Sequence, residues 1–93
     1  MDTQEFETRL KQGGYLDIET KQAPANFTSK LHTHEFDVRA LILSGELKLT
    51  REGKSDTYRA GQTFEMAAGC LHTEEYGPHG TSYLVGRRHA GPK

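Results

Sequence analysis

Three histidines in this chain have a spacing that suits a metal ion. His32 and His34 stand one residue apart at the start of the hydrophobic stretch LHTHEFDVRALILSGELKL. On an extended strand, residues two apart project from the same face, so both imidazoles can reach one ion. His72, from a separate β-rich segment, would add a third imidazole. Neutral imidazole binds iron, zinc, copper and nickel well, and the pattern therefore predicts a mononuclear metal site.

A carboxylate would complete such a site, and two residues are candidates. Glu74 follows His72 by two residues and shares its face, where it could bind the metal, accept a proton from a substrate or orient a histidine. A solvent-exposed carboxylate at the rim of the fold is the alternative. Asp37 is closer to the histidine pair, but strand alternation places it on the opposite face. There it is expected to form a surface pair with Arg39, unless the strand bulges.

Short β-rich segments must position these residues. Turn signals such as Ser44-Gly45, Ala60-Gly61 and Ala68-Gly69 separate them, and many short strands at this spacing predict an all-β sandwich or barrel. The Ser44-Gly45 turn is expected to join its two flanking segments as a hairpin. The predicted strands are YLDIE, NFTSKL, FDVRALIL, ELKLT, TYR, TFEMA, LHTEEY and TSYLVG.

Alternation along the histidine segment assigns its two faces. If His32 faces inward, the inner stripe consists of two imidazoles followed by apolar residues, which is typical of a barrel strand with a functional mouth and a packed base. Leu41 and Leu43 then face outward and need burial by an N-terminal helix, a second sheet or a dimer partner. The inward residues are His32, His34, Phe36, Val38, Ala40 and Ile42.

The first residues differ from the rest, because they predict a short helix. Phe6 and Leu10 are four apart and form an apolar edge. Thr3 can cap the amide of Phe6, and Gly13-Gly14 ends the segment. The predicted order is helix, β domain and tail, over residues 3–12, 15–87 and 88–93.

The composition excludes several classes of function. The 93 residues suit one domain, and 12 basic against 13 acidic residues, with no basic stripe, give no electrostatic case for nucleic-acid binding. No apolar run reaches membrane-spanning length, and the N-terminus has no signal-peptide pattern. The single cysteine, Cys70, allows no internal disulfide, and a reducing cytoplasm is the expected location.

Two motifs resemble those of the cupin family. The first cupin motif pairs HxH with a glutamate and a later glycine, and the second places two glycines at fixed distances before a histidine. The resemblance implies a cupin-type jelly-roll barrel, a double-stranded β-helix, with a metal in its mouth held by the three histidines. The matching positions are His32, His34 and Gly45 in the first motif, and Gly61, Gly69 and His72 in the second.

The sequence departs from the family's pattern most clearly at the glutamate ligand. Depending on the spacing, Val38 or Arg39 occupies that position, and neither can serve, since valine has no lone pair and arginine is always cationic. Ala67 replaces the usual proline, Asn26 a leading glycine and Tyr76 a final asparagine. Some cupin enzymes work with three histidines alone, so the missing glutamate does not exclude a metal.

The resemblance leaves two functions open. The first is an enzyme with divalent iron, manganese, nickel or zinc on the three histidines, a small polar substrate, and Glu74 as proton acceptor; its chemistry would be dioxygenase-like with iron. The second is a non-catalytic module that binds or senses a small ligand. A metal that only stabilises the barrel, or a metal-free cupin with hydrogen-bonded histidines, are the structural alternatives. The family's usual homodimer is also expected.

Overall fold

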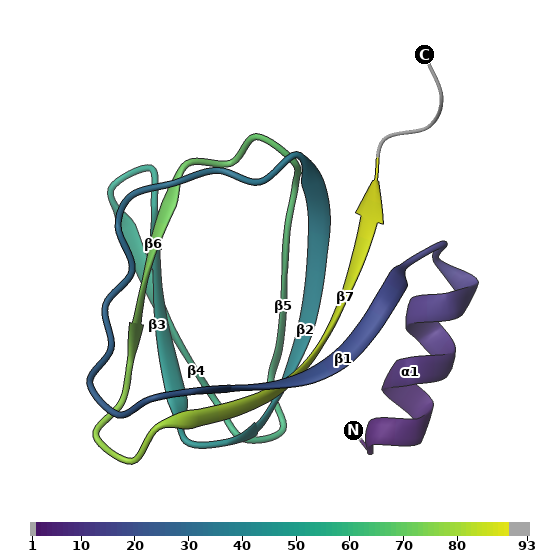
Figure 1. The fold of residues 1–93 in the computed structure, drawn as a ribbon, viewed down its shortest axis with the longest axis horizontal. Helices are drawn as coiled ribbons and strands as arrows, with labels where there is room; N and C mark the ends of the chain where they lie inside the picture. The colour runs from purple at the N-terminus through teal and green to yellow at the C-terminus, as the bar shows by residue number, and fades with distance from the viewer. Residues whose placement is uncertain (1, 90–93) are drawn as a thin grey trace.

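The fold consists of two facing β-sheets with one helix outside them (Figure 1). The computed structural model describes residues 2–89. The helix and the all-β domain that the sequence predicts are both confirmed. Within the described residues the elements are α1 (Thr3–Gln12), β1 (Leu16–Ala23), β2 (Phe36–Ser44), β3 (Glu46–Arg51), β4 (Lys54–Arg59), β5 (Thr63–Met66), β6 (His72–Tyr76) and β7 (Thr81–His89).

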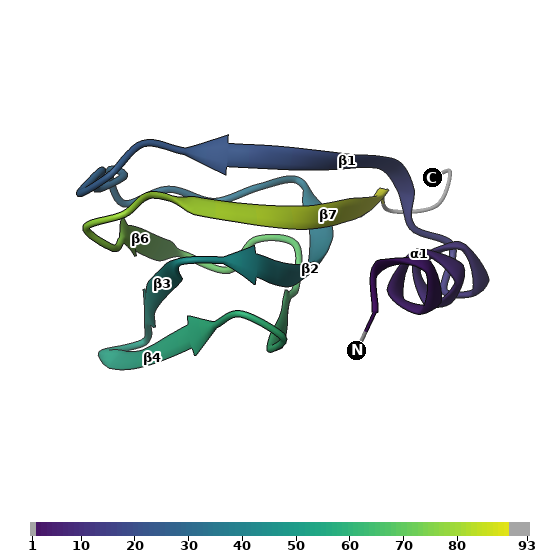
Figure 2. The same ribbon diagram turned by 90° about the horizontal axis from the view of Figure 1, so that it is seen from below.

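Both sheets are antiparallel, and the main hydrophobic core lies between them. The first sheet has the strand order β1-β7-β2-β5 and the second has the order β4-β3-β6. Figure 2 shows α1 at the end of the molecule opposite β3, β4 and β6. The buried residues of this core are Val38, Ala40, Ile42, Leu47, Leu49, Phe64, Met66, Tyr76 and Val85.

Strand alternation explains how this core forms. Val38, Ala40 and Ile42 of β2 point into the space between the sheets, as the inward stripe predicts. Leu47 and Leu49 of β3 meet them from the other sheet. Burial of each large aliphatic side chain contributes about 1.5–3 kcal/mol. The interdigitated stripes therefore hold the two sheets together below the histidine segment.

The hairpin predicted at Ser44-Gly45 is wrong. β2 pairs with β5 and β7 in the first sheet, whereas β3 pairs with β4 and β6 in the second. The chain therefore passes from one sheet to the other at Gly45. This residue has a φ of +77°, and a Cβ there would lie 2.0 Å from the carbonyl oxygen of Gly80. A close crossing between two sheets requires this glycine, and the hairpin lies instead between β3 and β4, at Glu52-Gly53.

The N-terminal helix covers the outer face of the first sheet. Leu41, which alternation places outward on β2, is buried beneath α1. Of the options that the sequence leaves for burying this residue, the structure shows the helix. No helix in the described part of the chain has the length and apolar character needed to cross a membrane. The buried members of this second cluster are Phe6, Leu10, Tyr15, Leu41 and Leu84, with Ile18 and Leu43 packed against them.

The cap of α1 is Asp2, and the predicted Thr3 cap is wrong by one position. The Asp2 backbone is extended, and its carboxylate accepts a hydrogen bond from the Glu5 amide at 2.8 Å. Thr3 is already the first helical residue. Asp2 therefore satisfies one of the amides that the first turn leaves without an intrahelical partner.

Two substitutions distinguish these cap assignments. Asp2→Ala is expected to lower the free energy of unfolding by about 1 kcal/mol, because the Glu5 amide loses its acceptor. Thr3→Ala is expected to change it by less than about 0.5 kcal/mol, as for other exposed positions. Urea denaturation of the two variants measures both values. A larger loss in the threonine variant would contradict the assignment.

Two further boundaries differ from those predicted. The segment NFTSKL forms no regular strand, and its Thr28 makes only an isolated bridge to Glu75. At the other end, β7 continues through Arg88 and His89, so these residues belong to the barrel wall and not to a tail. The remainder of the predicted tail, residues 90–93, lies outside the described residues.

Candidate metal centre

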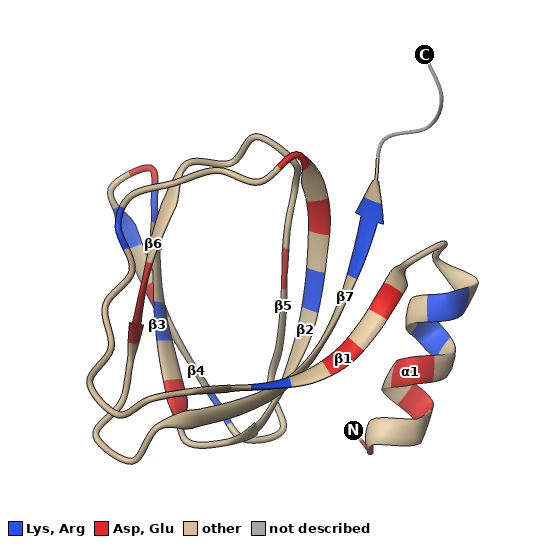
Figure 3. Ribbon diagram, viewed as in Figure 1, with Lys and Arg blue, Asp and Glu red and all other residues tan. Residues whose placement is uncertain are grey.

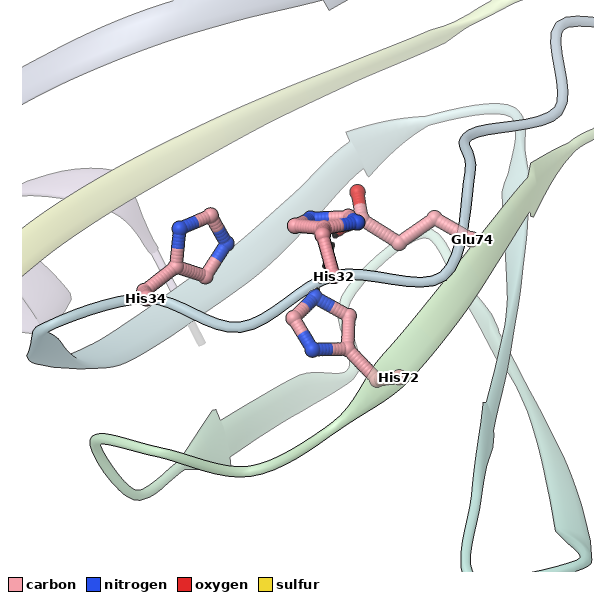
Figure 4. Close-up of side chains that lie close together, drawn as sticks. All are labelled: His32, His34, His72 and Glu74. Atoms are coloured by element: carbon pink, nitrogen blue, oxygen red, sulfur yellow. Dashed lines mark hydrogen bonds and ion pairs between the residues drawn. The ribbon is translucent and has the colours of Figure 1, made fainter.

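Four side chains converge near the start of β6 (Figure 4). His32 and His34 come from the segment that leads into β2, and His72 and Glu74 come from β6. Each offers one ligand atom, and these atoms all lie within 4.8 Å of one another. The structure therefore brings together the three histidines and the glutamate that the sequence singles out as a group that could hold a metal.

Backbone hydrogen bonds fix where these side chains begin. His32 and His72 form an antiparallel bridge, in which the amide of each donates to the carbonyl of the other at 3.0 Å. The carbonyl of His34 accepts a hydrogen bond from the Gly69 amide at 2.8 Å. The loop before β6 is thus tied to both ends of the His-x-His segment. The three imidazoles are held on a common face although His72 follows His32 by forty residues in the sequence.

The outer ring nitrogens of two histidines already have partners. Nδ1 of His32 lies 2.5 Å from the Lys30 carbonyl oxygen, and Nδ1 of His72 lies 2.9 Å from the Cys70 carbonyl oxygen. A carbonyl oxygen only accepts, so both Nδ1 atoms carry the hydrogen and donate it. In the neutral tautomer, each Nε2 then presents a lone pair toward the centre of the group. Metal-ligating histidines have this arrangement, with the second ring nitrogen donating to a carbonyl.

Glu74 faces these two Nε2 atoms with one carboxylate oxygen. Its Oε2 lies 3.0 Å from Nε2 of His72 and 3.5 Å from Nε2 of His32. Its Oε1 accepts the hydroxyl of Tyr76, and its amide donates to the Ser29 hydroxyl at 2.9 Å. Burial, followed by the bond to Glu74, raises the pKa of Tyr76 above its usual value, so the phenol remains a donor. Tyr76 therefore fixes the carboxylate with Oε2 turned toward the histidines.

His34 is favoured in its neutral form. Its ring stacks on Phe36, with 5.0 Å between centroids. Burial lowers the pKa of His34 below its usual value, and the neighbouring His32 and His72 lower it further. Because an imidazole must be unprotonated to bind a metal, this environment prepares His34 as a ligand.

Two of the separations between the ligand atoms, those from Glu74 to His72 and His32, suit neighbouring ligands of one metal. Two ligands that each lie about 2.1 Å from an ion are about 3.0 Å apart at a right angle and about 3.4 Å apart at the tetrahedral angle. Oε2 of Glu74 stands 3.0 and 3.5 Å from the two Nε2 atoms, in the range of neighbouring ligands. Three neutral imidazoles and one carboxylate are also ligands that iron, zinc, nickel and manganese accept. The residues present therefore fit a divalent ion.

Asp37 does not take part, and its predicted pairing with Arg39 is wrong. β2 pairs with β7 without a bulge from Phe36 to Ile42, so Asp37 keeps the outward direction that alternation gives it. Its carboxylate accepts a hydrogen bond from the Ala68 amide at 2.8 Å and two hydrogen bonds from Arg88 nitrogens at 2.9 and 3.1 Å. These bonds, that from Ala68 most strongly, lower the pKa of Asp37. Arg39 instead binds Glu65, at 2.8 Å.

A cavity of about 220 Å³ adjoins the four side chains. His32, His34, Glu74 and Tyr83 form part of its wall. Lys21 and Arg87 also line it, and neither is singled out by the sequence motifs. The one available signal for Arg87 is that the alternation of TSYLVG continues past Val85 and puts residue 87 on the same face.

Comparisons with known proteins agree with this architecture. No family model matches the chain, and its sequence has no match among the curated proteins. Solved structures do match. The similar ones include a conserved protein of unknown function from Streptococcus pyogenes, with a TM-score of 0.70 and 23% identity over 81% of this chain and 65% of that one.

Two other similar structures carry a fold name. One is an RmlC-like cupin from Shewanella frigidimarina NCIMB 400, with a TM-score of 0.70 and 17% identity over 83% of this chain and 68% of that one. The other is a cupin superfamily protein from Desulfitobacterium hafniense DCB-2, with a TM-score of 0.69 and 16% identity over 78% and 66%. The chain has the cupin fold. It spans about two thirds of the length of these three proteins.

The departures from the cupin motifs can now be placed in the barrel. Val38, at one of the two positions where the usual glutamate is expected, is buried in the core between the sheets. Asn26 replaces a glycine and has a φ of +58°, a left-handed conformation that asparagine tolerates. The turn that lacks proline still closes, with the Cys70 amide donating to the Ala67 carbonyl at 3.2 Å. The carboxylate of the site comes from Glu74 in β6 and not from β2.

Proposed function

We propose that this cupin is a metal-dependent enzyme that acts on a small polar substrate. One divalent ion, of iron, manganese, nickel or zinc, is held by His32, His34 and His72. Glu74 lies beside it, and its Oε2 is both the fourth ligand atom, the only oxygen among the four, and the proton acceptor of the site. The substrate occupies the adjoining cavity of about 220 Å³.

One observation carries this proposal. The Nδ1–H groups of His32 and His72 are turned toward backbone carbonyls, which leaves two Nε2 lone pairs facing one oxygen of Glu74. Three lone pairs that face one another in a partly buried site repel, unless a cation or a proton lies between them. A divalent ion satisfies all three at once, whereas a single proton is shared by only two atoms.

The two oxygens of Glu74 have different tasks in this proposal. The metal would supply Lewis-acid activation of an oxygen-bearing substrate and, if it is iron, a site for dioxygen. The Tyr76 hydroxyl donates to Oε1 of Glu74, so Oε2 is the atom that can take a proton from the substrate, on the lone pair that is not directed at the metal. Ser29 holds the backbone of Glu74 and keeps this oxygen at the cavity wall.

Turnover measurements test the enzymatic proposal. The protein is purified without a histidine tag, loaded separately with each of the four metals, and supplied with small diketones, thiols and hydroxy acids. Oxygen consumption and product formation are followed, and at least one pair of metal and substrate is expected to turn over. Glu74→Gln keeps an oxygen at this position but cannot take a proton, so it is expected to abolish turnover. Unchanged turnover in this variant would exclude Glu74 as the base.

The alternative is a non-catalytic cupin that binds or senses a small ligand. The cavity beside the histidines favours this alternative as much as it favours an enzyme, since both need space for a small molecule. The same experiment separates them. A ligand that binds to the metal-loaded protein and is recovered unchanged, with every metal, supports the binding module.

Replacement of Tyr76 by phenylalanine tests the support that Glu74 receives. The substitution removes one hydroxyl and preserves the ring, which is buried in the core. The affinity for zinc is expected to fall about tenfold, because loss of a group that orients a ligand typically costs ten- to hundredfold. Competition with a chromogenic chelator measures this change. Tyr58→Phe, which alters a tyrosine outside the site, is the control.

A homodimer remains an expectation from the cupin resemblance. In the sequence, the outward-facing Leu41 of β2 needs a cover, and a dimer partner is one of the options. In the structure α1 covers Leu41, so this residue does not require a partner chain. Exposed large apolar residues on the described surface include Leu31 and Leu71, which lie on the two segments that carry the histidines. Light scattering coupled to size-exclusion chromatography tests the dimer, which requires a mass of two chains.

A further inference from the structure

Two cationic side chains line the inside of the barrel beside the candidate metal centre. On β7, Val85 points into the core, and Arg87 follows it by two residues on the same face. The Arg87 side chain is 19% exposed, and its guanidinium lies over the ring of Phe36 at 5.6 Å. Lys21 of β1, which pairs with Tyr83 of β7, lines the same cavity. Figure 3 shows basic positions in both of these neighbouring strands.

These cations have only weak internal partners, one of which is the Asp17 carbonyl oxygen, which accepts a hydrogen bond from Nη1 of Arg87 at 3.3 Å. Glu19 lies between them, with its oxygens 3.7 Å from Nη1 of Arg87 and 3.8 Å from Nζ of Lys21. Both distances exceed that of a hydrogen bond, and the Glu19 side chain is 48% exposed. An inward-facing guanidinium is costly unless it is well paired. Both contacts of Arg87 use Nη1, so its Nε and Nη2 donors remain to bind an anion from the cavity.

The charge around the cavity also favours an anion. Its wall carries the cations Lys21 and Arg87 against the single carboxylate of Glu74, while Glu19, which lies near both cations, is not part of the wall. A divalent ion on the histidines would increase this positive surplus further. A negatively charged ligand would relieve it, and arginine is suited to a carboxylate because its parallel N–H groups can donate to both oxygens.

The remaining wall restricts the size and polarity of the ligand. Phe64, Met66, Val38 and Val85 form an apolar surface in the cavity. A volume of about 220 Å³ corresponds to about seven water molecules at ~30 Å³ each, which is smaller than a site for a drug-sized molecule. The ligand is therefore small, with a hydrocarbon part that can cover this surface.

We propose that the ligand of this cupin is a small carboxylate with a short hydrocarbon body. Its carboxylate pairs with Arg87 and Lys21, and its hydrocarbon part packs on the apolar wall. This inference rests on the proposed function, because it names the substrate class of the same site. It does not require the metal to make the contact with the carboxylate, so the two proposals can fail separately.

Isothermal titration with two matched probes tests the inference. Isovalerate has a branched hydrocarbon body and a carboxylate, and isovaleramide has the same shape without the charge. The zinc-loaded protein is expected to bind isovalerate at least about tenfold more tightly than isovaleramide, the effect of about one charge-assisted hydrogen bond. The titrations are repeated after dialysis against EDTA, and the preference for isovalerate is expected to persist with weaker affinity.

Substitutions assign the preference to its residues. Arg87→Gln and Lys21→Gln are each expected to weaken isovalerate about tenfold and to leave isovaleramide and zinc stoichiometry unchanged. Arg87→Lys should recover part of the affinity. Lys48→Gln removes a cation from the exposed side of β3, 3.5 Å from Glu75, and is expected to have no effect. Thermal unfolding confirms that each variant is folded.

The outcomes separate this inference from the metal proposal. Equal binding of the two probes, or full isovalerate affinity in Arg87→Gln, would overturn the inference even if zinc binds. Isovalerate selectivity that depends on Arg87 in a protein that binds no zinc would support the inference and contradict the metal site. Inorganic phosphate is titrated as a third probe, and binding as tight as that of isovalerate would show an unselective anion site and overturn the assignment of a hydrocarbon-bearing ligand.

Discussion

Replacing His34 with alanine is expected to lower the affinity for a divalent metal by more than about a hundredfold, since even groups that only orient a ligand contribute ten- to hundredfold. His34 supplies one of three imidazoles, and alanine offers no lone pair in its place. The backbone at residue 34 keeps its hydrogen bond from Gly69, so the loop that carries the site remains tied. The fold should therefore persist while the metal is lost.

Zinc titration of the metal-free protein measures this effect, with circular dichroism to confirm the fold. His79→Ala is the matched control, because His79 is exposed in the turn after β6 and does not belong to the group of four side chains. It is expected to bind zinc as tightly as the unsubstituted protein. If the His34 variant also retained that affinity, the ligand assignment would be wrong, and a metal-free cupin with hydrogen-bonded histidines would be favoured.

Replacing Gly45 with alanine is expected to cost more than about 4 kcal/mol of stability, in the range of the most damaging single substitutions. A Cβ at this residue would lie 2.0 Å from the Gly80 carbonyl oxygen and 3.1 Å from the Thr81 Cα. Both obstacles are backbone atoms, so no side chain can rotate to relieve the clash. A domain of this size has about 5–15 kcal/mol to lose, and much of the variant is expected to be unfolded at room temperature.

Gly53→Ala separates the clash from backbone strain. Gly53 has a φ of +76°, nearly that of Gly45, but a Cβ there would meet no atom within 4 Å. Its loss of stability is expected to be about 1–2 kcal/mol, the cost of a left-handed conformation alone. Urea unfolding compares the two variants. If they lost similar stability, the close crossing of the chain at Gly45 would not be a constraint on the fold.

The sequence predicts the inner face of this barrel because that face depends on local alternation. Val38, Ala40 and Ile42 are buried as the period-two pattern requires, and the three histidines lie on one face although His32 and His34 precede the regular strand. The position of Glu74 follows from the same rule, since it is two residues beyond His72. Each of these predictions needs only the direction of a side chain within one segment.

The wrong predictions concern relations between segments that are distant in sequence. A hairpin at Gly45 is a reasonable local prediction, but the sheet that each strand joins depends on partners elsewhere in the chain. Asp37 pairs with Arg88 because β7 lies beside β2 and the two residues are opposite each other. The sequences of these two strands do not by themselves determine this register. Arg87 could not be placed in the cavity for the same reason. Register and strand order are set by the whole packed core.

Metal analysis of the purified protein tests the central claim most directly. The untagged protein is produced in medium supplemented with iron, manganese, nickel and zinc, and its bound metals are measured by mass spectrometry. A site built from His32, His34, His72 and Glu74 predicts about one equivalent of a divalent metal per chain, and its loss in the His34→Ala variant. Less than about a tenth of an equivalent, with no zinc taken up on titration, would contradict the metal site.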